Sequence, residues 1–136
     1  MKSKRPIPRG LRNNNPLNIR IGNVWLGEVQ NPTDREFEQF VHVTYGLRAA
    51  CVLIRRYINH YLLNTPREII SRWAPRSEND TNNYVRTACQ HAQLSPDTPI
   101  NYTDKTTVCR LLYGMIIVEC GQPIDPSVIA KGYDMA

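Results

Sequence analysis

The feature that most constrains the fold is an almost uninterrupted apolar run, Val108–Val118, which ends at the carboxylic acid Glu119. The run contains one charge, and Gly121 follows the acid by two positions. If the run is a helix, its spacing of three and four residues places Leu112 and Met115 on the same face as Glu119. The sequence therefore predicts a buried helix that carries a carboxyl group at its C-terminal end.

A carboxyl group on an apolar helix face is costly to ionise, so the pKa of Glu119 is expected to rise. A carboxylic acid that stays protonated near neutral pH is the group that general-acid catalysis requires. We therefore first consider an enzyme that cleaves bonds, and a glycosidase in particular.

Periodicity and capping signals predict a mainly α (α+β) single domain over residues 11–136, preceded by a flexible basic arm over residues 1–10. Alternation in EFEQFVHV predicts a short strand, with Phe37 facing one way and Glu36 and Glu38 the other. The expected elements are a strand over 36–43, helices over 45–63, 65–73, 81–93 and 104–120, and a helical turn near 126–131. The first helix carries an apolar stripe of Leu47, Cys51, Ile54, Ile58 and Leu62. The second begins with a capping box of Thr65 and Glu68, and Pro66 suits its first helical position.

Charge and hydropathy narrow the classes of partner. The net charge is +5, from 17 Lys and Arg against 12 Asp and Glu, and the excess lies in the first dozen residues. No apolar stretch approaches the ~20 residues of a membrane helix, and the basic N-terminus leads into no signal-like apolar run. We expect no membrane span and a protein that is cytoplasmic on synthesis. The arm also permits nucleic-acid binding, which we disfavour because no recognition-helix motif accompanies it.

The cysteines and histidines do not suggest a cofactor. Cys51, Cys89, Cys109 and Cys120 show no two-residue gap of the kind found in zinc and redox sites. The three histidines are scattered and form no HExxH pattern. We expect reduced thiols, no metal and no cofactor.

Several short motifs together resemble a small lysozyme-like family found in phages and prophages, whose members are often labelled virion or structural proteins. The resemblance covers most of the chain, and the motifs occur in the order of that family. They are RGLRNNNPLNIR, VWLGE, EFEQF, YGLRAA, REIISRWAP, ENDTNNY and IIVECG. The resemblance implies a lysozyme-like helical domain with a small β element, and peptidoglycan glycan strands as the partner.

A weaker resemblance, apparently circularly permuted, links the chain to flagellar and autolysin-type glucosaminidases and to lytic transglycosylases. In the glucosaminidases a helix ends in a catalytic Glu followed two residues later by Gly, as in Glu119 and Gly121. The chain also departs from the phage family. Leu17 stands where a Gly is usual, and Val118 and Cys120 stand where His and Asn are frequent.

The resemblances imply that Glu119 is the general acid and that a substrate-binding set surrounds it. A second carboxylate stays open, with Glu28, Glu78 and Asp80 as candidates, and a route with a single Glu is compatible with transglycosylase or substrate-assisted chemistry. Tyr84 is expected to donate a hydrogen bond, and tryptophans offer flat faces to sugars. The predicted substrate-binding residues are Asn15, Asn18, Trp25, Glu78 and Tyr84.

Two functions therefore compete. The first is cleavage of peptidoglycan glycan strands by a glucosaminidase, muramidase or lytic transglycosylase mechanism. The second is a catalytically inactive lysozyme-fold module that binds the virion or the cell wall, as the departures at Leu17, Val118 and Cys120 suggest. Either function places the protein in a virion, or at the cell wall once lysis has released it.

Overall fold

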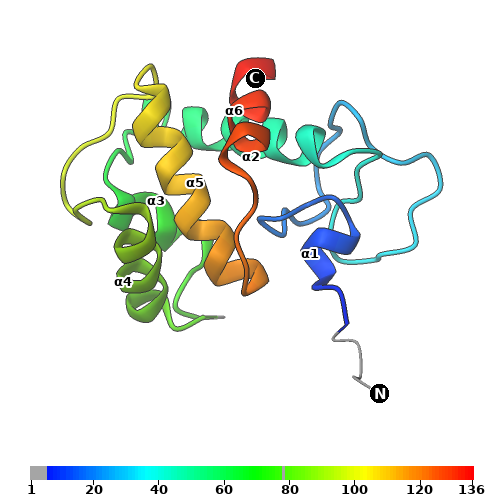
Figure 1. Ribbon diagram of the computed structural model, residues 1–136, viewed down its shortest axis with the longest axis horizontal. Coiled ribbons are helices and arrows are strands. Elements are labelled where there is room, and N and C mark those ends of the chain that lie inside the picture. Colours follow the sequence, from blue (N-terminus) through cyan, green and yellow to red (C-terminus); the bar gives the residue numbers. More distant parts are fainter. Residues whose placement is uncertain (1–5, 78) are drawn as a thin grey trace.

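The fold is mainly α-helical, as predicted, and the computed structural model describes residues 6–77 and 79–136. Figure 1 shows α5 crossing the centre, with α3 and α4 on one side and α1 with its following loops on the other. The expected arm boundary at residue 10 lies inside α1, and residues 1–5 lie outside the described part. The helices are α1 (Arg9–Arg12), α2 (Val43–Asn59), α3 (Pro66–Trp73), α4 (Thr81–Ala92), α5 (Lys105–Cys120) and α6 (Pro126–Met135).

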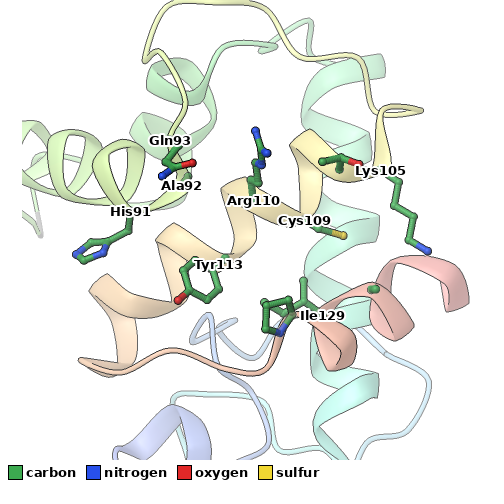
Figure 2. A pocket seen from close by; sticks show the side chains of 11 residues that line it. His91, Ala92, Gln93, Lys105, Cys109, Arg110, Tyr113 and Ile129 are labelled. Atoms are coloured by element: carbon green, nitrogen blue, oxygen red, sulfur yellow. The ribbon is translucent and has the colours of Figure 1, made fainter.

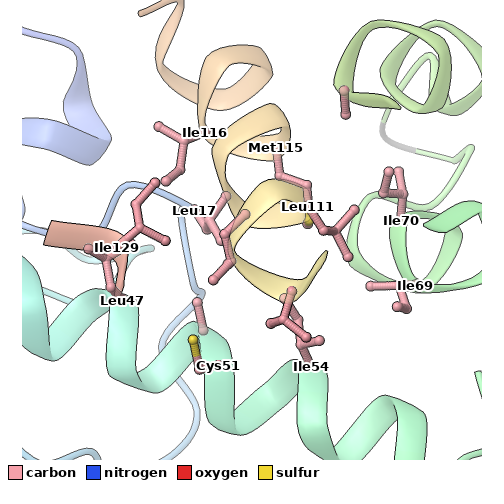
Figure 3. Packing of buried hydrophobic residues seen from close by; sticks show 14 of the residues in the cluster. Leu17, Leu47, Cys51, Ile54, Ile69, Ile70, Leu111, Met115, Ile116 and Ile129 are labelled. Atoms are coloured by element: carbon pink, nitrogen blue, oxygen red, sulfur yellow. The ribbon is translucent and has the colours of Figure 1, made fainter. Parts of the chain in front are cut away.

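The apolar run forms α5, the helix around which the others pack. α1, α4 and α6 all contact it. Leu111, Met115 and Ile116 are fully buried, and Figure 3 shows them facing side chains of neighbouring segments, including Leu47 and Ile70. A helix that is apolar on most of its surface is stable only inside a core, which is the position that α5 occupies.

The predicted apolar stripe of α2 is confirmed at four of its five positions. Leu47, Cys51, Ile54 and Ile58 are all buried, whereas Leu62 lies beyond the end of the helix at Asn59 and is 75% exposed. The helix begins at Val43, two residues earlier than expected, because the His42 side chain accepts a hydrogen bond from the backbone of the first turn. It places its apolar face against α6 and the core (Figures 1 and 3).

Side-chain caps fix the ends of α3, α4 and α5. Thr65 and Glu68 form the predicted capping box at the start of α3. Asp80 caps α4 and Asp104 caps α5, each by accepting a backbone N–H. Gly121 ends α5 with φ 72°, a left-handed conformation that glycine adopts without steric cost.

The strand expected over residues 36–43 is not formed, and no other strand occurs in the described residues. Two isolated antiparallel bridges stand in its place, between Arg20 and Phe37 and between Glu28 and Phe40. Side-chain amides take over part of the hydrogen bonding that a sheet would supply. Asn14 Nδ2 donates to the carbonyl oxygen of Phe40, and Asn15 Nδ2 to that of Glu38. The segment is thereby held as ordered loops.

A charged cluster closes these loops against α1. Arg9 binds both carboxylate oxygens of Asp34 at 2.7 Å, and Asn13 Nδ2 donates to the same carboxylate at 2.9 Å. These donors, the Arg9 guanidinium first, hold the pKa of Asp34 well below its usual range. Arg9 and Arg20 also lie over the ring of Phe37. The basic α1 is thus tied to the following loops by specific pairs.

The C-terminal segment forms more helix than the single turn expected near 126–131. α6 runs from Pro126 to Met135, and its start is fixed by Pro126 at the first helical position and by the Asp125 cap. The four cysteines are free thiols. Within residues 6–77 and 79–136, no helix combines the length and apolarity needed to cross a membrane.

The close approach of α4 and α5 gives a stability prediction. A Cβ at Gly114 would overlap the backbone carbonyl of Ala88, which cannot rotate away. The added methyl group should destabilise the fold by about 3 kcal/mol through overpacking. Replacing Gly by Ala in a helix gains only about 1 kcal/mol in helix propensity. We expect Gly114→Ala to lower the free energy of unfolding by about 2 kcal/mol in urea denaturation. Gly22→Ala is the matched control, because no atom lies within 4 Å of its Cβ position. Equal stability of the two variants would contradict the packing argument.

Candidate active site

The site centres on the carboxylate of Glu119 in the last turn of α5. Asn18 Nδ2 donates to Oε1 at 2.8 Å, and the Tyr84 hydroxyl donates to Oε2 at 2.9 Å. The structure thus brings together three of the predicted site residues from three separate segments. The Glu119 side chain is half-buried, so part of it remains open to solvent.

The turn that carries Asn18 is shaped by its asparagines. Asn14 and Asn18 have φ of 54° and 52°, a left-handed conformation that asparagine tolerates better than most side chains. Asn15 is fully buried, and its side-chain amide bonds the backbone of Ile19 and Glu38 at 2.9–3.0 Å. The predicted substrate contact Asn15 therefore lies inside the protein, where it holds the turn that presents Asn18.

Contacts from two helices fix the same turn against the core. Trp73 Nε1 at the end of α3 donates to the carbonyl oxygen of Leu17 at 3.1 Å, and the Cys120 thiol donates to that of Pro16 at 3.2 Å. The Leu17 side chain itself is 1% exposed. Two of the three departures from the phage pattern, the buried Leu17 side chain and the Cys120 thiol, thus hold the turn in place.

Tyr84 reaches Glu119 from the second turn of α4. The helix begins after Asp80, and the Thr81 hydroxyl donates to the carbonyl oxygen of Ala74 at 2.6 Å. Tyr84 is 5% exposed, so its ring is a core residue and only its hydroxyl serves the site. Burial, followed by the charge of Glu119, raises the pKa of Tyr84 well above its usual value. The phenol therefore stays a proton donor.

The pKa of Glu119 is raised, as the sequence argument expected. Burial is the largest cause, and the hydrogen bonds from Asn18 and Tyr84 partly oppose it because they stabilise the carboxylate. The last turn of a helix also disfavours negative charge. Because the folded pKa is raised, the proton on Glu119 favours the folded state at low pH. This contribution is lost as pH rises through the folded pKa.

The Asn18 amide can accommodate either protonation state of Glu119. With Nδ2 donating to the carboxylate, the buried Oδ1 has no partner among the described groups. A half-turn of the amide would instead let Oδ1 accept the proton of a neutral Glu119 carboxyl group.

The remaining predicted residues lie elsewhere. Trp25 is partly buried against the core, and its Nε1 has no partner among the described groups. Glu78 lies outside the described residues. Of the candidate second carboxylates, Asp80 caps α4 and Glu28 contacts the carboxyl group of Glu38. No second acid is therefore seen to meet Glu119 among the described residues.

Glu38 is the residue that sequence reasoning misplaced. Alternation put Glu36 and Glu38 on the same face of a strand, opposite Phe37, yet Glu36 is exposed and Glu38 is only 7% exposed. With no strand formed, the alternation does not govern the burial of these residues. An acid flanked by aromatic residues in EFEQF gave no separate signal of burial.

The described hollows lie away from this acid. Five surface hollows with volumes of about 270–600 Å³ are lined by residues other than Glu119. Figure 2 shows one of about 530 Å³ between α4, α5 and α6, with His91, Arg110 and Tyr113 around it. The candidate site is therefore a half-buried polar cluster, distinct from these hollows.

Comparison with known proteins places the chain among phage proteins. Over 131 residues it is 37% identical to "Protein P5" of Pseudoalteromonas phage PM2, and the match covers 93% of this chain and 80% of that protein. The chain belongs to the family of phage PM2 Protein P5. No model of a known protein family matches it. The phage relationship is thus established, and the lysozyme-like relationship stays a prediction.

The two donors to Glu119 generate a prediction for this P5-family site. Tyr84→Phe removes one hydrogen bond to the ionised carboxylate, so the pKa of Glu119 should rise by about one unit. The titration can be followed by ¹³C NMR of labelled Glu carboxyl groups. Tyr113→Phe is the control on α5, because Tyr113 lines the separate hollow in Figure 2. An unchanged or lowered pKa in Tyr84→Phe would show that the phenol does not stabilise the carboxylate.

Proposed function

We propose that the protein cleaves the glycan strands of peptidoglycan, with Glu119 as the single general acid. The observation that supports this most is a half-buried carboxyl group whose pKa is raised and whose two oxygens are oriented by Asn18 and Tyr84. The motif resemblance to lysozyme-like phage proteins points to the same polymer. A phage protein meets this polymer when a virion enters or leaves a bacterial cell.

In this mechanism, protonated Glu119 transfers its proton to the glycosidic oxygen as the C–O bond breaks. The anomeric carbon is then captured either by water, giving a hydrolysed product, or by a hydroxyl group of the sugar, giving an anhydro product. In both cases the attacking group loses a proton to the Glu119 carboxylate, which regenerates the acid. Asn18 and Tyr84 stabilise the carboxylate that remains after proton transfer. Because each carboxylate oxygen accepts one described side-chain bond, its other lone pair remains available for the transferable proton.

The second candidate function is a non-enzymatic module that binds the cell wall or the virion. One observation favours it: Glu119 also ties α5 to α4 and to the turn at Asn18, as a purely structural carboxylate would. A structural tie needs no approach by substrate, and the described hollows are lined by other residues. This function predicts binding to insoluble peptidoglycan without bond cleavage.

Glu119→Gln separates the two functions. Gln can accept from Tyr84 and donate to a rotated Asn18 amide, so the melting temperature should change by only a few degrees. Release of reducing ends or anhydro-sugars from purified peptidoglycan should fall by about 10²-fold or more, because the proton donor is lost. Glu68→Gln is the matched control, since Glu68 is exposed and Gln also serves in a capping box.

The outcomes are distinct. Cleavage by the wild type and by Glu68→Gln, with none by Glu119→Gln, supports the enzyme. Equal cleavage by all three proteins removes Glu119 as the acid. Sedimentation with peptidoglycan, with no product from the wild type, supports the binding module.

A further inference from the structure

A second pair of carboxyl groups lies in the loops behind the candidate site. Glu28 and Glu38 belong to the two segments joined by the isolated bridge between Glu28 and Phe40. Backbone hydrogen bonds from Val29 to Gln39 and from Val41 to Gly27 flank this bridge, so Glu28 and Glu38 are diagonal neighbours across it. Glu28 Oε1 and Glu38 Oε2 are both buried, and neither has a donor among the described groups. Two carboxylates offer only acceptors, so a hydrogen bond between these neighbours requires a proton on one of them.

Among the described residues, no ion pair joins a cation to Glu28 or Glu38; Arg9 pairs with Asp34 and Arg20 with Glu36. Burial is the main cause that raises the pKa of Glu38 to about 7, followed by the hydrogen bond with Glu28 and its charge. At the start of α2, His42 is exposed and its Nδ1 faces the Thr44 hydroxyl. The shared proton is therefore the group that keeps the two acids together.

The backbone of Glu38 connects this pair to the turn of the candidate site. Its N–H donates to the carbonyl oxygen of Ile19 at 2.9 Å, and its carbonyl oxygen accepts from Asn15 Nδ2 at 3.0 Å. Asn15 and Ile19 flank Asn18, which donates to Glu119. Movement of residue 38 would thus be transmitted through two hydrogen bonds to the residue that orients the proposed acid.

We propose that Glu28 and Glu38 form a proton-sharing carboxyl pair that positions the Asn18 turn against Glu119. The pair is a positioning element, because its atoms contact the turn through the backbone of residue 38 and do not touch Glu119. Its effect on catalysis rests on the proposed function of Glu119, whereas its effect on the turn does not.

The sign of the pH effect follows from the direction of the shift. Because the folded pKa of Glu38 lies above the unfolded value of 4.5, the shared proton stabilises the folded loops fully below that value. The stabilisation is lost as pH rises towards about 7. Above that range both acids ionise, and their repulsion loosens the segments around residues 28 and 38.

The test uses the full chain with ¹³C-labelled Glu carboxyl groups and amide hydrogen exchange. The wild type should show a carboxyl titration with a midpoint near 7. After correction for the intrinsic rate, exchange at the Ile19 and Glu38 amides should rise about tenfold between about pH 5.5 and 8.5. In Glu28→Gln, where the amide can donate to Glu38, that midpoint should fall by about one unit or more. The rise in exchange should also disappear.

Two further variants keep the result interpretable. Glu38→Gln is a second test of the pair, to be used if Glu28→Gln folds poorly. It should also abolish the pH-dependent exchange at Ile19. Glu36→Gln, an exposed acid in the same loop, should behave like the wild type. Cleavage of peptidoglycan by the wild type should decline over the same pH range more steeply than cleavage by Glu28→Gln.

Each outcome decides one claim. The proposed pair would be overturned if every Glu carboxyl group other than that of Glu119 titrates with an ordinary midpoint. It would also be overturned if amide exchange at Ile19 shows the same pH dependence in the wild type and in Glu28→Gln. If the titration and exchange behave as expected but no pH shows cleavage, the pair is upheld and the proposed enzyme fails. If cleavage occurs with the same pH profile in both proteins, the coupling to Glu119 is refuted.

Discussion

The packing of the apolar helix α5 against α1, α4 and α6 governs the arrangement of this protein. α5 can be buried only if α4, α6 and the N-terminal turn all cover it, and Gly114 lets α4 approach closely. That burial brings the carboxyl group at the end of α5 into the interior, where water no longer solvates it fully. The protein supplies two donors, Asn18 and Tyr84, in place of that water.

The loops before α2 show how a protein can order a long segment without a sheet. Asn13, Asn14 and Asn15 each direct a side-chain amide at a different part of residues 34–40. Their bonds do for this segment what ladder bonds do in a hairpin. This solution places polar side chains inside the protein, and it also leaves the carboxyl group of Glu38 buried beside another acid.

Local signals predicted the structure best where neighbours in sequence decide it, as in α3 and α5. Thr65, Pro66 and Glu68 predicted the start of α3, and the apolar run with its glycine predicted α5 and its end. The resemblance suggested that Asn18 and Tyr84 belong near Glu119. The burial of Asn15 and Glu38 was not predicted, because it depends on partners more than twenty residues away. Neither was the loss of the strand, since alternation does not reveal whether a partner strand exists.

The bond between Asn18 and Glu119 joins residues 101 positions apart in the chain. Contacts of such separation require a large loop to close, and its entropic cost must be met by structure formed earlier. The acid and its orienting amide therefore meet only when the chain between them has folded so that its two ends lie together. A partly synthesised or partly folded chain has no assembled site. Any activity that depends on this contact is therefore absent until a chain that contains both residues has folded.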